Sequence, residues 1–202
     1  MKVIGVTGPT GSGKSLFCDY LSKNRIPVID ADEVYHGLLV PPSPCLDALK
    51  TAFGDGILYK DGTLDRGKLS EIVFHDAQRL ELLNRTVLGF VLNRIRYMLR
   101  ALERDGFPCV VVDAPTLIES DFHRECDTVI SILSPMELRM ERIIRRDGLT
   151  REKAEARIRA QKDDEFYKRH SHYVLTNTGD TEEFLKKIPP VVQELGLSIP
   201  SA

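Results

Sequence analysis

The feature that most constrains this chain is the run GPTGSGKS at residues 8–15. It follows an apolar run at residues 3–6 and precedes a helical pattern at residues 14–21, so the order is strand, loop and helix. The run satisfies G-x-x-x-x-G-K-[ST], in which glycines let successive backbone N–H groups turn towards phosphate oxygens. A coincidental glycine turn, with odds of roughly one in a hundred in such a chain, is the alternative. We therefore expect a nucleoside triphosphate site, with Lys14 at the β- and γ-phosphates and Ser15 on Mg²⁺.

Further short apolar runs occur at residues 26–29, 107–112, 128–133 and 173–175, and helical stretches separate them. Strands that alternate with helices predict an open, doubly wound α/β sheet, in which ligands bind beyond the carboxyl ends of the strands. With the phosphate loop, this predicts a P-loop NTPase fold similar to nucleoside monophosphate kinases, built on five parallel strands flanked by helices.

The length of 202 residues suits a single compact unit with inserts. We expect a nucleotide-binding core at residues 1–33, 105–140 and 171–195, and a helical substrate-binding insert at residues 34–104, where residues 64–105 carry helix-spaced apolar side chains. Residues 136–161 are helical in pattern, broken near Gly148 and basic on one side, which is typical of a closing lid. We place this lid at residues 141–170.

Carboxylates follow two of the predicted strands. Asp30 and Asp32 come after residues 26–29, where one could accept a proton from an attacking hydroxyl or cap the following helix. Beside a nucleotide site, Asp32 is the better candidate for the base, and Asp30 the better one for organising the turn or binding metal-bound water. Asp113 ends another apolar run, where contact with Mg²⁺ and simple turn formation are equally good interpretations.

Arginines are dense in the predicted lid, and this side chain suits a transferring phosphoryl group because its planar fork stays charged. For any one of them, a solvated face paired with a nearby glutamate is the alternative. Arg142 and Arg146 lie four residues apart on one helix face, so they are the preferred candidates for the phosphates.

Composition argues against several classes of partner. A formal net charge of −2 does not favour a nucleic acid partner, and no run approaches the ~20 apolar residues of a membrane helix. The N-terminus passes straight into glycine-rich sequence and leaves no room for a signal peptide, so we expect a cytoplasmic location. The four cysteines are widely spaced and suggest neither a zinc site nor a redox pair.

With these residues in place, the sequence resembles the dephospho-CoA kinase family from residue 3 to about residue 179. Each matching segment is weak alone, but their order and spacing are specific. The segments are GVTG and GSGKS in the loop, VIDAD at residues 28–32, DGTLDR at residues 61–66, IVF at residues 72–74, Pro115 with Glu119, residues 142–147, TRE at residues 150–152, Gln161, Tyr173-Val174, Asn177 and Gly179.

The resemblance implies that Asp32 matches the base for the ribose 3′-hydroxyl, and that Arg66 and Glu119 line the substrate side. It places Arg142 and Arg146 on the lid and Asn177 near the adenine of ATP. The nucleotide-binding residues are then expected to be Gly11, Ser12, Gly13, Lys14, Ser15, Leu16 and Asn177.

The chain departs from the family pattern at several positions. Pro9 and Thr10 replace a commoner Gly-Ile pair, and Thr116 replaces a leucine after Pro115. Leu88-Gly89 stands where His-Pro is usual, and Tyr167 where a basic residue is frequent. The loss of that histidine and that cation is expected to affect substrate affinity or lid closure.

The expected reaction is ATP + 3′-dephospho-CoA → ADP + CoA, with Mg²⁺ bridging the β- and γ-phosphates. Small molecules are the expected partners. The loop alone says little about the acceptor, so a kinase for another nucleotide or small metabolite is an alternative. A nucleotide-dependent switch is a further alternative, since fold does not determine function.

Overall fold

A computed structural model of the chain describes residues 1–74 and 76–197. The chain forms two compact units, which are described separately. The sheet unit comprises Met1–Ile29 and the stretch from Leu102 onward, and the helical unit comprises Asp30–Ala101.

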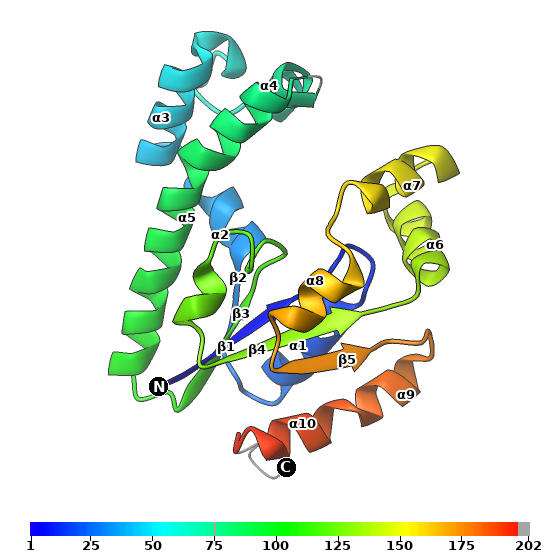
Figure 1. Cartoon of the computed structure of the whole chain (residues 1–202). Helices are drawn as coiled ribbons and strands as arrows, with labels where there is room; N and C mark the ends of the chain where they lie inside the picture. The colour runs from blue at the N-terminus through cyan, green and yellow to red at the C-terminus, as the bar shows by residue number, and fades with distance from the viewer. Residues whose placement is uncertain (75, 198–202) are drawn as a thin grey trace. The chain divides into compact units, whose positions relative to one another are not determined.

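The sheet unit is built on five strands in the order β2-β3-β1-β4-β5 (Figure 1). Strand β1 lies between β3 and β4 and pairs with both in parallel, with Lys2 opposite Cys109, and β4 pairs in parallel with β5. The expected five-stranded parallel sheet is therefore confirmed. The strands are β1 (Lys2–Thr7), β2 (Val28–Asp30), β3 (Cys109–Asp113), β4 (Thr128–Leu133) and β5 (Tyr173–Thr176).

Helices cover both faces of this sheet. Those of the sheet unit are α1 (Lys14–Lys23), η2 (Phe122–Glu125), α6 (Met136–Asp147), α7 (Arg151–Arg159), α8 (Asp164–Arg169), α9 (Thr181–Lys186) and α10 (Ile188–Glu194). The predicted break near Gly148 is confirmed, because this glycine has a φ of +64° and separates α6 from α7. The two helices pack together through Met140 and Ile143 on one side and Ala154 and Ile158 on the other.

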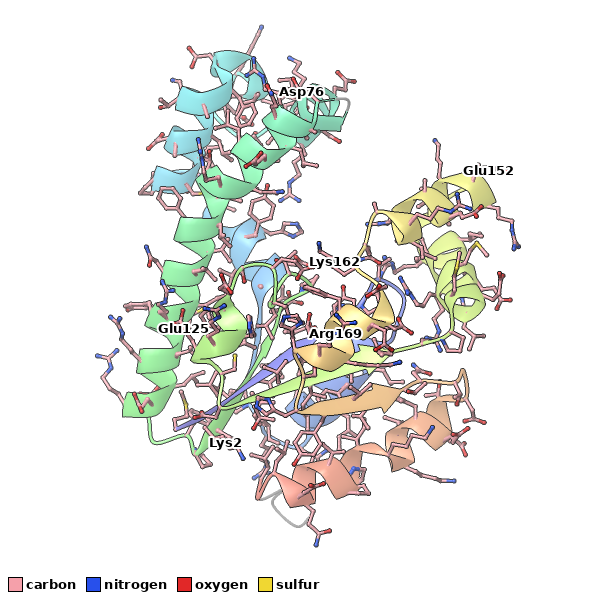
Figure 2. The ribbon with its side chains drawn as sticks, viewed as in Figure 1. Lys2, Asp76, Glu125, Glu152, Lys162 and Arg169 are labelled. Atoms are coloured by element: carbon pink, nitrogen blue, oxygen red, sulfur yellow. The ribbon has the colours of Figure 1, made fainter. Side chains whose placement is uncertain are left out.

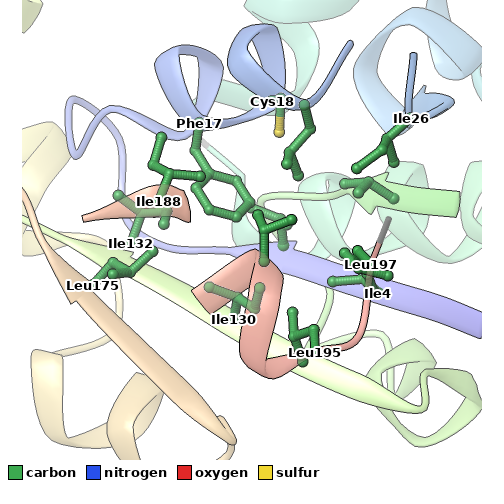
Figure 3. Packing of buried hydrophobic residues seen from close by; sticks show 14 of the residues in the cluster. Ile4, Phe17, Cys18, Ile26, Ile130, Ile132, Leu175, Ile188, Leu195 and Leu197 are labelled. Atoms are coloured by element: carbon green, nitrogen blue, oxygen red, sulfur yellow. The ribbon is translucent and has the colours of Figure 1, made fainter. Parts of the chain in front are cut away.

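One apolar core fixes α1, α9 and α10 against the sheet (Figure 3). Phe17 of α1 and Ile188 of α10 have no exposed surface, and neither do Ile4 of β1 and Ile132 of β4. Burying a side chain of this size stabilises the fold by about 1.5–3 kcal/mol. This packing holds the start of α1, and hence the end of the phosphate loop, against the strand that precedes it.

The helical unit contains α2 (Ala31–Leu38), α3 (Pro44–Phe53), η1 (Asp55–Ile57), α4 (Arg66–Phe74) and α5 (Ala77–Arg104), the last continuing into the sheet unit. The predicted helical character of residues 64–105 is confirmed, although it is divided between α4 and α5. Asp76 marks the division, because its carboxylate accepts hydrogen bonds from the N–H groups of Gln78 and Arg79 at the start of α5.

A separate apolar cluster holds the helical unit together. Its buried members come from α3, η1 and α4, with Leu39 and Leu64 from the segments between helices. They include Leu49 and Ile57, which have no exposed surface. An isolated antiparallel bridge joins Leu58 to Leu64. None of the helices described, in either unit, is long and apolar enough to cross a bilayer.

Candidate active site

The phosphate loop connects β1 to α1, and its glycines adopt conformations that other residues rarely reach. Gly8, Gly11 and Gly13 have φ values of +141°, +76° and +104°. A Cβ atom on Gly8 would lie 2.2 Å from the carbonyl oxygen of Ile132, and one on Gly13 would lie 2.4 Å from the Nδ2 atom of Asn177. The loop therefore depends on glycine for its backbone shape and for its close approach to neighbouring segments.

Hydrogen bonds inside the loop set its curvature. The N–H of Ser12 donates to the carbonyl of Pro9 at 3.2 Å. The Lys14 ammonium donates to the carbonyl of Gly8 at 3.1 Å, so the lysine lies along the loop. Ser15 is exposed in the first turn of α1, whereas Leu16 is half-buried against the core of the sheet unit. A helix N-terminus preceded by N–H groups of this kind attracts an anion.

Arg142 and Asn177 hold the outer side of the loop. The Nη1 atom of Arg142 donates to the carbonyl of Gly11 at 2.9 Å, and its Nη2 atom donates to Oδ1 of Asn177 at 3.0 Å. Asn177, which is 3% exposed, donates from Nδ2 to the carbonyl of Ser12 at 3.1 Å. Burial lowers the pKa of Arg142, and the neighbouring Arg145 lowers it further. Arg142 and Asn177, which were both candidates from the sequence, therefore lie side by side and donate hydrogen bonds to carbonyls of the phosphate loop.

Arg146 has a different environment from Arg142. It is exposed and pairs with the adjacent Asp147 at 2.7 Å, and Arg157 pairs with the same carboxylate. The hydrogen bond from Arg146 is the main cause that lowers the pKa of Asp147. The structure therefore gives the two lid arginines different partners, and their joint action on the phosphates stays a prediction.

Arg139 was not selected from the sequence, although it is the most buried of the arginines along this segment. It is 5% exposed, and it donates to the carbonyl of Thr10 and to the side chain of Gln161. Burial lowers the pKa of its guanidinium, while the nearby Asp164 and Tyr167 act in the opposite direction. The available signal was its position on the apolar face of α6, between Met136 and Met140, where a charged residue requires an explanation.

Asp113 is the last residue of β3 and is buried at the carboxyl end of the sheet. Its Oδ2 atom lies 3.5 Å from the thiol of Cys18 on α1. This carboxylate and the exposed hydroxyl of Ser15 are the kinds of oxygen that bind Mg²⁺ together with phosphate oxygens. In the described part of the chain, no three His, Cys, Asp or Glu side chains gather into a metal site.

A hollow of about 320 Å³ lies beside Glu119, in the segment that follows β3. Glu119 is exposed, and the hollow is also lined by Lys162, Phe166 and His170. A second hollow of about 460 Å³ adjoins the same three residues and reaches Arg169, at the end of α8. Figure 2 labels Lys162 and Arg169. Both combine basic groups and aromatic rings with carboxylates, which are Glu119 and Asp121 in the first hollow and Asp163 in the second.

Tyr167, one of the departures from the family pattern, is a core residue and not a surface residue. It belongs to α8, is 1% exposed and packs with Ile118 and Leu133. Burial, reinforced by Glu119, raises the pKa of Tyr167 to about 12. A basic side chain at this position would be buried in an apolar cluster, so the surroundings of residue 167 in this chain favour tyrosine over a basic residue. Thr116 is exposed in the turn after β3.

Asp30, Asp32 and Arg66 belong to the helical unit, of which Asp30 is the first residue. The carboxylate of Asp30 caps α2 by accepting from the N–H groups of Asp32 at 2.7 Å and Glu33 at 3.2 Å. Asp30 was expected to organise this turn, and its carboxylate does bind the N–H groups there. Asp32 is exposed in the first turn of α2, and Arg66 is exposed at the start of α4, where its charge opposes the rise in the pKa of Tyr35 that burial causes. Leu88 and Gly89 lie within α5.

The chain matches one protein family over most of its length. The family model for dephospho-CoA kinase matches residues 2–183. A dephospho-CoA kinase of Lactobacillus johnsonii is 34% identical over 193 residues, covering 96% of this chain and 98% of the relative. One from Symbiobacterium thermophilum is 37% identical over 182 residues, covering 90% of this chain and 76% of the relative.

Solved structures agree with these relatives. The crystal structure of TT1252 from Thermus thermophilus superposes with a TM-score of 0.79 at 32% identity, over 96% of this chain and 97% of that one. Dephospho-CoA kinase from Campylobacter jejuni superposes with a TM-score of 0.72 at 28% identity, over 96% and 98% of the two chains. Shikimate kinase from Acinetobacter baumannii, at 20% identity and a TM-score of 0.58, shares the fold.

Proposed function

The chain belongs to the dephospho-CoA kinase family, and from this premise we propose that it transfers the γ-phosphoryl group of ATP to the ribose 3′-hydroxyl of 3′-dephospho-CoA. The products are ADP and coenzyme A, so the reaction is the last step of coenzyme A synthesis. The observation that carries this proposal is the family match over residues 2–183, which includes both the phosphate loop and the helical unit.

The donor half of the site is assigned to the phosphate loop. We assign the triphosphate to backbone N–H groups of the loop, to the positive end of α1 and to the Lys14 ammonium, which lies along the loop. Leu16 and Asn177 complete the predicted nucleotide-binding set. Ser15 and Asp113 are the residues assigned to Mg²⁺, which supplies charge neutralisation at the β- and γ-phosphates.

The acceptor half is assigned to Asp32 as the general base. Its carboxylate is exposed in the first turn of α2, so it can reach a substrate hydroxyl, and Asp30 fixes this turn by capping it. Arg66 and Glu119 are proposed to line the acceptor site. Residues 34–104 are proposed to form the substrate-binding insert, and the hollow beside Glu119 offers Lys162 and Arg124 for a phosphate and Phe166 for a base.

The lid is assigned to residues 141–170, with residues 1–33, 105–140 and 171–195 as the nucleotide-binding core. Arg142 and Arg146 are proposed to offset charge on the transferred group. Arg142 donates hydrogen bonds to loop carbonyls, whereas Arg146 forms an exposed ion pair with Asp147. To bind a phosphate, only Arg146 would therefore have to give up an exposed ion pair. We infer a cytoplasmic enzyme that acts on small molecules and not on nucleic acid.

A coupled assay of ADP release tests the proposal directly. The chain with ATP and Mg²⁺ should turn over 3′-dephospho-CoA with a kcat/KM at least about 10²-fold above that for shikimate or any of a panel of nucleoside monophosphates. Transfer to a monophosphate without transfer to dephospho-CoA would indicate another small-molecule kinase. ADP release that no acceptor accelerates would indicate a nucleotide-dependent switch.

A further inference from the structure

Thr10 lies at the point of the phosphate loop where the backbone changes direction, and both of its backbone polar groups face away from the loop interior. Its N–H donates to Oε1 of Gln161 at 3.0 Å, and its carbonyl accepts from Nε of Arg139 at 3.0 Å. The Nη2 atom of Arg139 donates to the same Oε1 atom at 3.0 Å. Thr10, Arg139 and Gln161 therefore form a closed hydrogen-bonded triangle, with one glutamine oxygen shared by two donors.

The neighbouring carbonyls are held in the same direction. Arg139 binds the carbonyl of Thr10, Arg142 that of Gly11 at 2.9 Å, and Asn177 that of Ser12 at 3.1 Å. In a planar trans peptide the N–H points away from the C=O of the same peptide group. Holding the carbonyls of Thr10 and Ser12 on the outside therefore turns the N–H groups of Gly11 and Gly13 towards the loop interior, while the N–H of Ser12 donates to the carbonyl of Pro9. This is the orientation that an anion-binding nest requires.

The triangle is built as a buried and charged contact. Arg139 is 5% exposed, and its guanidinium donates to two uncharged acceptors, the carbonyl oxygen of Thr10 and the amide oxygen of Gln161. Hydrogen bonds from a charged donor are short and roughly twice as strong as neutral ones. A Cβ atom on Gly11 would lie 2.8 Å from the backbone carbonyl of Arg139, so the loop also packs directly on α6.

We propose that Arg139 and Gln161 are positioning residues for the triphosphate of ATP. They orient the backbone at Thr10, and through it the N–H donor of Gly11, while neither side chain needs to touch a phosphate. Gln161 follows α7, so the same contact ties the end of the helical pair α6–α7 to the donor site. The inference rests on the proposed ATP site but not on the identity of the acceptor.

Gln161→Leu provides the test, because it removes the shared oxygen while keeping a side chain of similar size on a half-buried connecting segment. Calorimetric titration with MgADP should give a Kd about 10- to 100-fold higher than that of the parent chain, the loss expected when a hydrogen bond to a charged group is removed. The KM for ATP should rise by a similar factor, while the KM for dephospho-CoA stays within about twofold.

Two further variants separate positioning from a merely structural role. Gln161→Glu keeps an oxygen acceptor for Thr10 and Arg139, so it should bind MgADP at least about fivefold more tightly than Gln161→Leu. Arg159→Gln, an exposed change at the end of α7 that breaks only the pair with Glu155, should bind like the parent.

The proposal is overturned if Gln161→Leu binds MgADP like the parent, or if Gln161→Glu is as weak as Gln161→Leu. A lowered unfolding midpoint with unchanged MgADP affinity would also overturn it, because the triangle would then serve stability alone. If the parent binds MgADP but fails to phosphorylate dephospho-CoA, the proposed acceptor is wrong and the positioning inference is unaffected.

Discussion

Substitution of Gly8 by alanine should destabilise the sheet unit more than any exposed glycine substitution in it. The added Cβ would lie 2.2 Å from the carbonyl oxygen of Ile132, and this oxygen belongs to the backbone of β4. No side-chain rotation can relieve the contact. Either β4 moves away from the loop or the loop moves away from β4.

The cost has two parts. A φ of +141° is a conformation that glycine alone adopts readily, and it costs alanine about 1–3 kcal/mol. Overpacking against a rigid neighbour adds about 1–3 kcal/mol. The lower entropy of the unfolded alanine chain recovers about 0.4–1 kcal/mol, so the free energy of unfolding should fall by about 1–5.5 kcal/mol. For a chain of this size the thermal midpoint should fall by about 2–22 °C.

Thermal unfolding followed by far-ultraviolet circular dichroism measures this change, with Gly106→Ala as the matched control. Gly106 also has a positive φ, of +81°, but its Cβ would meet nothing within 4 Å. The control should therefore lose only about 0–1.5 kcal/mol, from backbone strain less the entropy gain. Equal midpoints for the two variants would refute the reasoning, because the contact with Ile132 would then have no cost.

Three further predictions concern catalysis and alkaline stability. In steady-state assays, Asp32→Asn should lower kcat by about 10²–10⁴-fold at an unchanged KM for ATP. Glu33→Gln, one residue along the same exposed turn, should leave kcat unchanged. A normal kcat for Asp32→Asn would remove Asp32 as the base. Lys14→Ala should raise the KM for ATP and lower kcat, since the ammonium lies along the loop, and unchanged constants would contradict the loop assignment. Because burial raises the pKa of Tyr167 to about 12, the folded state holds the phenolic proton more tightly than the unfolded state, so stability should fall as pH rises from about 10 to about 12. Tyr167→Phe should flatten this part of a urea-unfolding profile measured against pH, and an unchanged slope would exclude Tyr167 as the cause.

The strands and the loop could be predicted because their signals are local. The apolar run before Gly8, the loop glycines and the break at Gly148 all express the conformational preference of a few adjacent residues. Residues 31–53 were harder, since Pro41, Pro42 and Pro44 interrupt the helical pattern. Only the capping contacts of Asp30 and Ser43 define where α2 and α3 begin.

Tertiary contacts could not be predicted in the same way. Arg139 resembles the exposed lid arginines in sequence, and its burial depends on Thr10 and Gln161, which are distant along the chain. Tyr167 appeared as a missing cation, but it is buried because the face of α8 that carries it packs against β4. The individual roles of the site residues remain predictions, because they depend on substrates as well as on the fold.

The strand order has a consequence for how the chain is made on the ribosome. Strand β1 is synthesised first, but one of its two neighbours begins at Cys109 and the other at Thr128. At about 5–20 residues per second, the apolar β1 waits roughly 5–20 s before its first partner is even translated. During that interval the whole helical unit emerges as one uninterrupted stretch with its own apolar cluster. The nascent chain must therefore keep an unpaired strand from aggregating while an unrelated core forms behind it.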